Sequence, residues 1–100
     1  MNQAMINRIK KMQKEMMDAQ DRLQNSTFEG TAGGGLVRVV VKGTKDVISV
    51  NIDPAILNPD DKEMIEDTIL AAINQAFDKV DKETEEVMAP YAALTGGFGF

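Results

Sequence analysis

The sequence of 100 residues has no cysteine and no histidine, and each absence excludes a class of chemistry. Without cysteine the chain has no disulfide framework, no thiolate nucleophile and no thiolate metal site. Without histidine it lacks the commonest general base and the commonest metal ligand. No apolar run reaches the roughly 18 residues of a membrane span, and the amphipathic N-terminus lacks the apolar core of a secretory signal. We therefore expect a soluble intracellular protein that is not an enzyme.

What the chain does contain is the composition of one folded domain. Hydrophobic residues make up 43% of the sequence and charged residues 27%, a balance typical of globular chains. This length leaves no room for a second domain with its own core, so we expect residues 1–100 to form a single domain.

The first quarter of the sequence predicts one long helix, from about residue 2 to about residue 25. Its apolar residues recur at alternating steps of four and three, which is the 3.5-residue period of a coiled coil. Asn25, Ser26 and Thr27 end the pattern, because their side chains compete for backbone hydrogen bonds. We call this apolar stripe the seam, and its members are Met5, Ile9, Met12, Met16, Ala19 and Leu23.

Between about residues 27 and 53 the apolar period changes from helical to two. Two runs rich in β-branched residues, 36–42 and 47–53, are joined by a glycine-containing link, a pattern that predicts an antiparallel hairpin. Residues 28–32 predict a third, shorter strand. Alternation places one set of apolar residues on one face of each run: Val37, Val39 and Val41 on the first, and Ile48, Val50 and Ile52 on the second.

A second long helix is predicted from about residue 59 to about residue 89. Asn58 as N-cap and Pro59 at the first helical position form a strong start signal, and Pro90 disfavours helical geometry in the residue before it. A short extra turn is predicted over 91–94 and a flexible tail from about residue 95 to 100. The apolar stripe of this helix is wide enough to cover a sheet: Ile65, Ile69, Ala72, Ile73, Ala76, Phe77 and Val80.

These lengths predict more apolar surface than one small sheet can cover. The helices would be roughly 35 and 45 Å long, whereas a strand of about seven residues spans only about 23 Å. The six seam residues, at roughly 1.5–3 kcal/mol each, carry about 9–18 kcal/mol of potential burial. A coiled-coil seam needs a helical partner, either the overhang of the second helix or a second copy. We expect a homodimer.

The charges are unevenly distributed along the chain. Residues 1–25 hold five bases against three acids, whereas the second helix holds three lysines against ten carboxylates. We define the basic strip as the cations of the first helix, Arg8, Lys10, Lys11, Lys14 and Arg22. Such a strip predicts phosphate binding, because Lys and Arg release counterions from a polyanion. The simpler alternative is a solvated helix face, and Asp18 and Asp21 dilute the strip toward its end.

Three other candidate sites lack the residues that a reaction or a bound ligand would need. Residues 33–35 are three glycines, but they lack the Lys-Ser/Thr and the helix start of a phosphate-binding loop, so they predict a bend before a strand. Asp78, Asp81 and Glu85 share one face of the second helix, but nothing fixes a cation cage there. The two serines have no histidine to activate them. We predict no catalytic residue and no metal ligand.

The order of the segments resembles a known family. A helix rich in Met, Gln and Lys comes first. Three motifs of the strand region follow it: Phe28-Glu29-Gly30, Gly33-Gly34-Gly35-Leu36-Val37-Arg38-Val39 and Ile52-Asp53-Pro54. Two motifs of the second helix come last: Ile65-Glu66-Asp67 and Leu70-Ala71-Ala72-Ile73-Asn74-Gln75-Ala76. On these motifs nearly the whole chain is similar to the YbaB/EbfC family of small bacterial nucleoid-associated proteins.

The resemblance implies an α+β protomer, α-β-β-β-α, with long N- and C-terminal helices and a small antiparallel sheet. It implies a tweezer-like homodimer whose helices project from joined sheets. The implied function is binding of double-stranded DNA in the cytoplasm, at the nucleoid, with an influence on nucleoid organisation and gene expression. Neither an enzymatic activity, a cofactor nor a membrane is implied, and the implied partners are DNA, a second copy and other nucleoid or DNA-metabolism proteins.

A second interpretation of the same features is a non-enzymatic protein–protein adaptor. Its helical arms would grip another protein, and the acidic second helix and the Met-rich seam suit a basic or a helical partner. Partners of an adaptor persist after nuclease treatment, whereas partners held through DNA are lost.

Overall fold

The computed structural model describes residues 2–95, which form a three-stranded antiparallel sheet with one long helix before it and one after it. The elements are α1 (Gln3–Asn25), β1 (Thr27–Ala32), β2 (Val37–Lys42), β3 (Val47–Ile52) and α2 (Lys62–Met88), with 3-10 turns η1 (Pro54–Ile56), η2 (Pro59–Asp61) and η3 (Ala89–Thr95). This confirms the predicted α+β fold with the order α-β-β-β-α. Most of the predicted tail, residues 96–100, lies outside the described part.

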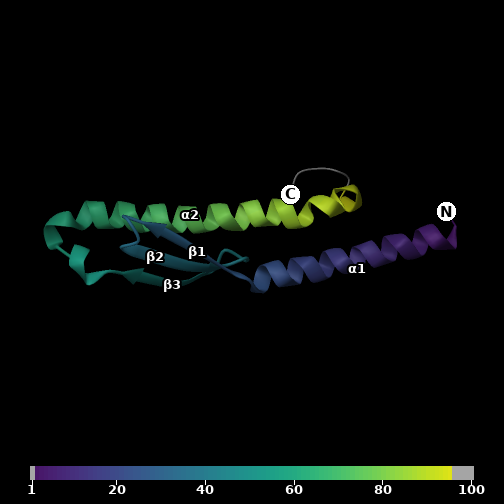
Figure 1. Cartoon of the computed structure of the whole chain (residues 1–100), viewed down its shortest axis with the longest axis horizontal. Helices are drawn as coiled ribbons and strands as arrows, with labels where there is room; N and C mark the ends of the chain where they lie inside the picture. Colours follow the sequence, from purple (N-terminus) through teal and green to yellow (C-terminus); the bar gives the residue numbers. More distant parts are fainter. Residues whose placement is uncertain (1, 96–100) are drawn as a thin grey trace.

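The molecule is elongated, with extents of 69 × 21 × 17 Å. α2 runs along the sheet and then along the C-terminal part of α1, so that the sheet and α1 lie one after the other on the same side of α2 (Figure 1). This arrangement follows from the lengths of the elements, because the strands are too short to cover α2 from end to end.

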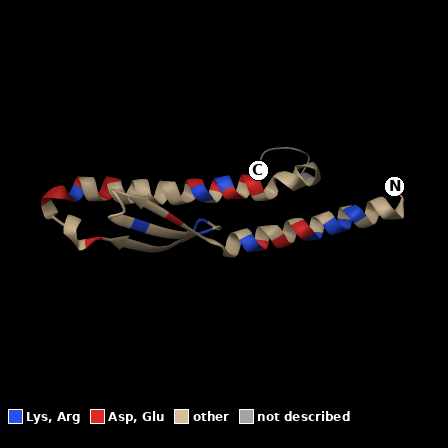
Figure 2. Cartoon of the chain, viewed as in Figure 1, with Lys and Arg blue, Asp and Glu red and all other residues tan. Residues whose placement is uncertain are grey.

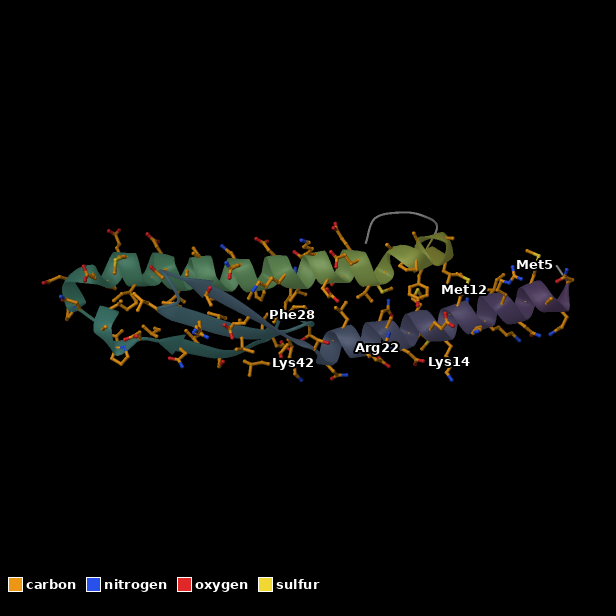
Figure 3. The ribbon with its side chains drawn as sticks, in the orientation of Figure 1. Met5, Met12, Lys14, Arg22, Phe28 and Lys42 are labelled. Atoms are coloured by element: carbon orange, nitrogen blue, oxygen red, sulfur yellow. The ribbon has the colours of Figure 1, made fainter. Side chains whose placement is uncertain are left out.

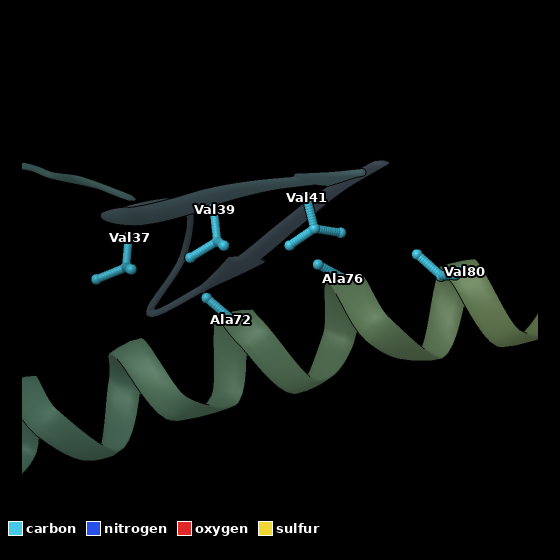
Figure 4. Close-up of a cluster of buried hydrophobic side chains, with 6 residues drawn as sticks. All are labelled: Val37, Val39, Val41, Ala72, Ala76 and Val80. Carbon is cyan, nitrogen blue, oxygen red and sulfur yellow. The ribbon is translucent and has the colours of Figure 1, made fainter. Parts of the chain in front are cut away.

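The core lies between α2 and the first two strands. The sheet order is β1-β2-β3, and α2 lies over β1 and β2. Three valines of β2 point toward three small or β-branched residues of α2, as predicted (Figure 4): Val37, Val39 and Val41 pack against Ala72, Ala76 and Val80, all at most 2% exposed. Ile69, Ile73 and Phe77 pack at the margin of this cluster.

A glycine lets α2 approach β1 closely. A Cβ atom on Gly30 would overlap the carbonyl oxygen of Ala72 and lie 2.6 Å from the backbone nitrogen of Ala76. The atoms in the way belong to helical backbone, which cannot rotate aside, so Gly30 is required for this packing distance.

The pairing of β3 differs in one detail from the predicted alternation. Val40 pairs with Ser49 but Val41 pairs with Val47, so the register shifts and Ile48 is the extra residue. The residues opposite the buried valines of β2 are therefore Val47, Val50 and Ile52, and Val47 takes the place predicted for Ile48. An irregularity of this kind adds one unpaired residue and interrupts the period-two pattern.

α2 begins slightly later than predicted. The side chain of Asn58 caps as expected, accepting a hydrogen bond from the Asp60 backbone N–H at 3.0 Å. The turn that it caps is the 3-10 turn η2, and the α-helix starts at Lys62. Tight turns of this kind are frequent at helix ends. At the other end α2 stops at Met88, and η3 continues through Pro90 as a 3-10 helix.

The two edge strands of the sheet, β1 and β3, differ in whether side chains bind their outward backbone groups. Along β1, side chains of α2 bind the outward backbone groups: Lys79 Nζ donates to the Glu29 carbonyl and Gln75 Oε1 accepts from the Thr31 N–H, both at 2.7 Å. Within residues 2–95 no side chain binds the backbone of β3, whose Val47, Ile48 and Val50 are 45–51% exposed. One edge is thus blocked and the other is open and apolar.

Candidate nucleic-acid interface

α1 is packed only near its C-terminal end. Its buried residues are Ala19 and Leu23, and Leu23 lines a small cleft together with Thr84 and Met88 of α2. The carbonyl of Leu23 also lies so close to Gly43 that a Cβ atom there would overlap it. The end of α1 is therefore fixed both to α2 and to the turn after β2.

The outer half of α1, residues 3–14, has no buried residue. Its start is well defined, because the Asn2 side chain accepts a hydrogen bond from the Met5 backbone N–H at 2.8 Å. Ile9 and Met12 are half-buried, and Met5 is 49% exposed. The outer half therefore projects from the body of the molecule with little tertiary support.

The seam lies on the side of α1 opposite Lys14 (Figure 3), whereas Arg22 borders a cleft between α1 and α2 together with the seam residues Ala19 and Leu23. Met5 and Met12 are on the side that faces α2 and η3, whereas Lys14 points away from them (Figure 3). The seam residues become more exposed toward the N-terminus of α1: Leu23 and Ala19 are buried, Met16 is half-buried and Met5 is exposed. The C-terminal part of the seam thus has a partner within its own chain, and its pairing with a second copy stays a prediction.

All five residues of the basic strip are exposed. Only Lys11 has an acidic neighbour within ion-pair distance, Glu15 at 4.0 Å, with both side chains at least half exposed. A pair of that kind contributes little to stability. Arg8, Lys10, Lys14 and Arg22 form no ion pair with any residue between 2 and 95. These four cations therefore contribute no ion pair to the stability of the described part of the fold.

The positive charge is concentrated in the outer half of α1. Residues 2–14 contain four cations and no acid, whereas Asp18 and Asp21 accompany Arg22 nearer the sheet. Figure 2 shows this positive stretch on α1 and the many acidic residues along α2. A polyanion is therefore attracted to one helix and repelled by the other.

Lys42 is a cation of this surface that the sequence analysis missed. It is exposed at the end of β2 on the face opposite the buried valines, and Figure 3 shows it on the same side of the molecule as Lys14. The alternating pattern of β2 predicts which face of the sheet Lys42 occupies. Its position next to the end of α1 depends on the pairing of Lys42 with Thr27, which the pattern does not predict.

The structure also places the other candidate sites. Gly33, Gly34 and Gly35 have positive φ angles of 64–88° and form the turn between β1 and β2, which does not lead into a helix. On α2, Asp81 binds Lys45 at 2.7 Å. In the described part of the chain no cluster of three or more carboxylates could hold a metal ion, and neither α1 nor α2 has the length and apolar content that a bilayer span requires.

Comparison with known proteins gives consistent matches along the chain. Residues 1–96 match the family described as the YbaB/EbfC DNA-binding family. Nucleoid-associated protein TTE0040 of Caldanaerobacter subterraneus is 43% identical over 95 residues, covering 94% of this chain and 82% of that protein. A nucleoid-associated protein of Acetivibrio thermocellus is also 43% identical over 95 residues, covering 95% and 81%. The crystal structure of the uncharacterized protein HP0035 from Helicobacter pylori has a TM-score of 0.71 at 21% identity, covering 91% of this chain and 97% of that one.

Proposed function

Because this chain belongs to the YbaB/EbfC DNA-binding family, we propose that it binds double-stranded DNA as a homodimer, mainly through backbone phosphates. This is a DNA-binding family and not an enzyme family, in agreement with the expected absence of catalysis. One observation carries the proposal: the outer half of α1 presents four exposed cations, of which three form no ion pair with any residue between 2 and 95 and Lys11 forms only an exposed one with Glu15.

The chemistry of the basic strip favours phosphate contacts over base contacts. Lysine and arginine side chains neutralise phosphates and release condensed counterions, which gives affinity without sequence information. Readout of bases requires side chains such as Arg, Asn or Gln clustered on an element that enters a groove. Lysine dominates the basic strip, so we expect weak sequence preference.

The homodimer is supported by the open edge of the sheet. Val47, Ile48 and Val50 form an exposed apolar surface on β3, while α2 blocks the edge at β1. An exposed apolar edge strand is an aggregation hazard unless something covers it. A second copy presents the same apolar residues and can cover it symmetrically. We place the dimer joint on β3, which leaves the two outer halves of α1 free to project.

Val50→Asp tests this joint. A charge on each copy would place two carboxylates in the apolar contact, so we expect a dimer for the native chain and a monomer for the variant in sedimentation at micromolar concentration. Asn51→Asp, on the polar face of the same strand, serves as the control and should remain dimeric. A native chain that sediments as a monomer contradicts the proposed homodimer.

The location follows from the DNA-binding proposal and from the names of the relatives. The proteins of Caldanaerobacter and Acetivibrio are named nucleoid-associated. We propose that this chain likewise acts at the nucleoid, in the cytoplasm, where binding along DNA would influence nucleoid organisation and gene expression.

A titration over a range of salt concentrations tests the phosphate mechanism. If about five phosphates are neutralised per dimer, log K against log[salt] should have a slope of roughly −4 to −5. The variant Lys10→Ala/Lys14→Ala should flatten this slope, because both lysines lie in the outer half and form no ion pair with any described residue. The control Lys62→Ala/Lys82→Ala removes the same charge from exposed positions on α2 and should leave the slope nearly unchanged. Equal slopes for the two variants contradict the proposal.

The adaptor interpretation keeps one structural observation in its favour, the exposed acidic surface of α2 (Figure 2). A pull-down with and without nuclease separates the two functions. We expect associated proteins to be lost when DNA is destroyed, and retention of a defined partner would favour the adaptor.

A further inference from the structure

The outer half of α1 combines accessible apolar residues with positive charge. Met5 is 49% exposed, and Ile6, Ile9 and Met12 are half-buried. The N-terminal end of α1 extends past η3 (Figure 1). Residues 2–14 contain four cations and no acid. Much of this part of the seam therefore stays accessible in the single chain, in a segment whose charge is all of one sign.

The cations of the outer half lie beside and opposite its apolar residues. Successive residues of an α-helix are turned by about 100°, so four apolar residues share an arc of about 120°: Met5, Ile6, Ile9 and Met12. Arg8 then lies beside one margin of this arc and Lys10 beside the other. Lys11 and Lys14 lie on the opposite side, and Figure 3 shows Lys14 pointing away from the labelled methionines of α1. The outer half is thus an amphipathic helix with a cation at each margin of its apolar arc.

The acids of α1 occur only where its own chain covers the seam. They are Glu15, Asp18 and Asp21, and the buried seam residues Ala19 and Leu23 lie in the same part of the helix. Two outer halves laid side by side would bring like charges together, with no acid in either segment to pair with them. The apolar arc of the outer half therefore suits a partner that offers apolar groups and negative charge together.

An anionic lipid surface has this chemistry. Amphipathic helices with Lys and Arg on the polar face lie in the plane of the bilayer interface, with the apolar face among the outer acyl groups. Long basic side chains at the margins keep their methylene groups in the apolar layer and their charge at the headgroups. Neither α1 nor α2 has the length and apolar content to span a bilayer, so such a contact is confined to the surface.

We propose that the outer half of α1 binds the surface of a bilayer of anionic phospholipids. Its apolar arc lies in the interface, and Arg8 and Lys10 contact the headgroup phosphates. The family resemblance implies no membrane, so this binding goes beyond the proposed function. Because the outer half is also the proposed DNA contact, duplex DNA should displace the protein from the lipid surface.

Flotation of the full chain with lipid vesicles tests this inference. At about 100 mM salt we expect binding to phosphatidylglycerol vesicles and at least about tenfold weaker binding to phosphatidylcholine vesicles. Met5→Gln/Ile9→Gln should weaken binding to phosphatidylglycerol at least about tenfold and leave duplex binding and its salt slope unchanged, because every cation remains. The matched control, Met64→Gln/Leu70→Gln, removes two apolar side chains of α2 that are 49% and 57% exposed, and should behave as the native chain.

A second variant tests the charges separately. Arg8→Gln/Lys10→Gln leaves the apolar arc intact and should weaken binding to phosphatidylglycerol roughly tenfold. Both double variants should keep the melting temperature of the native chain, because the outer half has no buried residue. Vesicle binding that is unchanged in either variant overturns the inference.

The remaining outcomes separate the inference from DNA binding. Equal binding of the native chain to the two kinds of vesicle, or binding to neither, overturns the inference and leaves DNA binding untouched. If the native chain sediments as a dimer and Met5→Gln/Ile9→Gln as a monomer, a second copy covers the apolar arc and the inference is wrong. If the native chain binds phosphatidylglycerol vesicles but no duplex, the inference stands and the proposed function fails.

Discussion

The sheet end and the outer half of α1 differ in what surrounds their side chains. In the sheet, Val37, Val39 and Val41 are completely buried against α2, and α2 side chains even bind the backbone along β1. In the outer half of α1 nothing is buried. The residues that stabilise the fold and the residues that present charge therefore occupy different parts of the molecule.

This separation determines how each region responds to mutation. A tightly packed region loses stability when a single atom is added or removed. A projecting helix with little tertiary support loses almost none, but its substitutions change what it can bind. Mutations should therefore lower stability strongly at the sheet, less at the end of α1 next to the sheet, and hardly at all at its outer half.

The largest expected loss of stability is that of Gly30→Ala. Its Cβ atom would overlap backbone of α2, so we expect the free energy of unfolding to fall by at least about 3 kcal/mol, measured by urea denaturation. Gly34→Ala is the control: nothing lies within 4 Å, and only its φ of +69° opposes the change, at a cost of about 1–2 kcal/mol. Equal losses would show that close packing at β1 is not decisive.

An intermediate loss is expected for Leu23→Ala. Leu23 is 8% exposed and joins α1 to the body, so its truncation should cost about 2–3 kcal/mol of unfolding free energy. Met17→Ala, at a position 61% exposed on the same helix, should change stability by less than about 0.5 kcal/mol. If the two variants unfold alike, α1 is not anchored through Leu23.

The smallest effect is expected for Met5→Ala. Met5 is half exposed in the outer half of α1, so unfolding free energy should change by less than about 0.5 kcal/mol. The measurement is made at two protein concentrations that differ a hundredfold. A larger, concentration-dependent loss would show that a second copy covers the outer seam, as the coiled-coil period predicts.

Much of this architecture could be predicted from the sequence because local rules agree with one another. The change in the period of the apolar residues, from 3.5 to two, predicted α1 and the strands. Asn58 and Pro59 predicted the start of the second helical region. The buried face of β2 was predicted, and so was most of the stripe of α2, but Ile65 lies outside the core cluster and the buried Met88 was not expected. Each depends on residues close together in the chain.

What the sequence did not give depends on contacts between distant segments. The partner of Leu23 is α2, more than sixty residues later, and a periodic seam does not say which helix covers it. The extra residue Ile48 depends on the pairing with β2. Lys42 was missed for the same reason, because its proximity to α1 comes from its pairing with Thr27.

The hydrogen bonds that Lys79 and Gln75 form with the β1 backbone also bear on stoichiometry. A sheet that offers hydrogen-bonding strands on both sides can add neighbours without limit and grow into a fibre. Here the chain itself blocks one edge, so two copies joined at β3, as proposed, would present only blocked edges to a third. Growth would then end at two copies, even at the high local concentration that binding along DNA would produce.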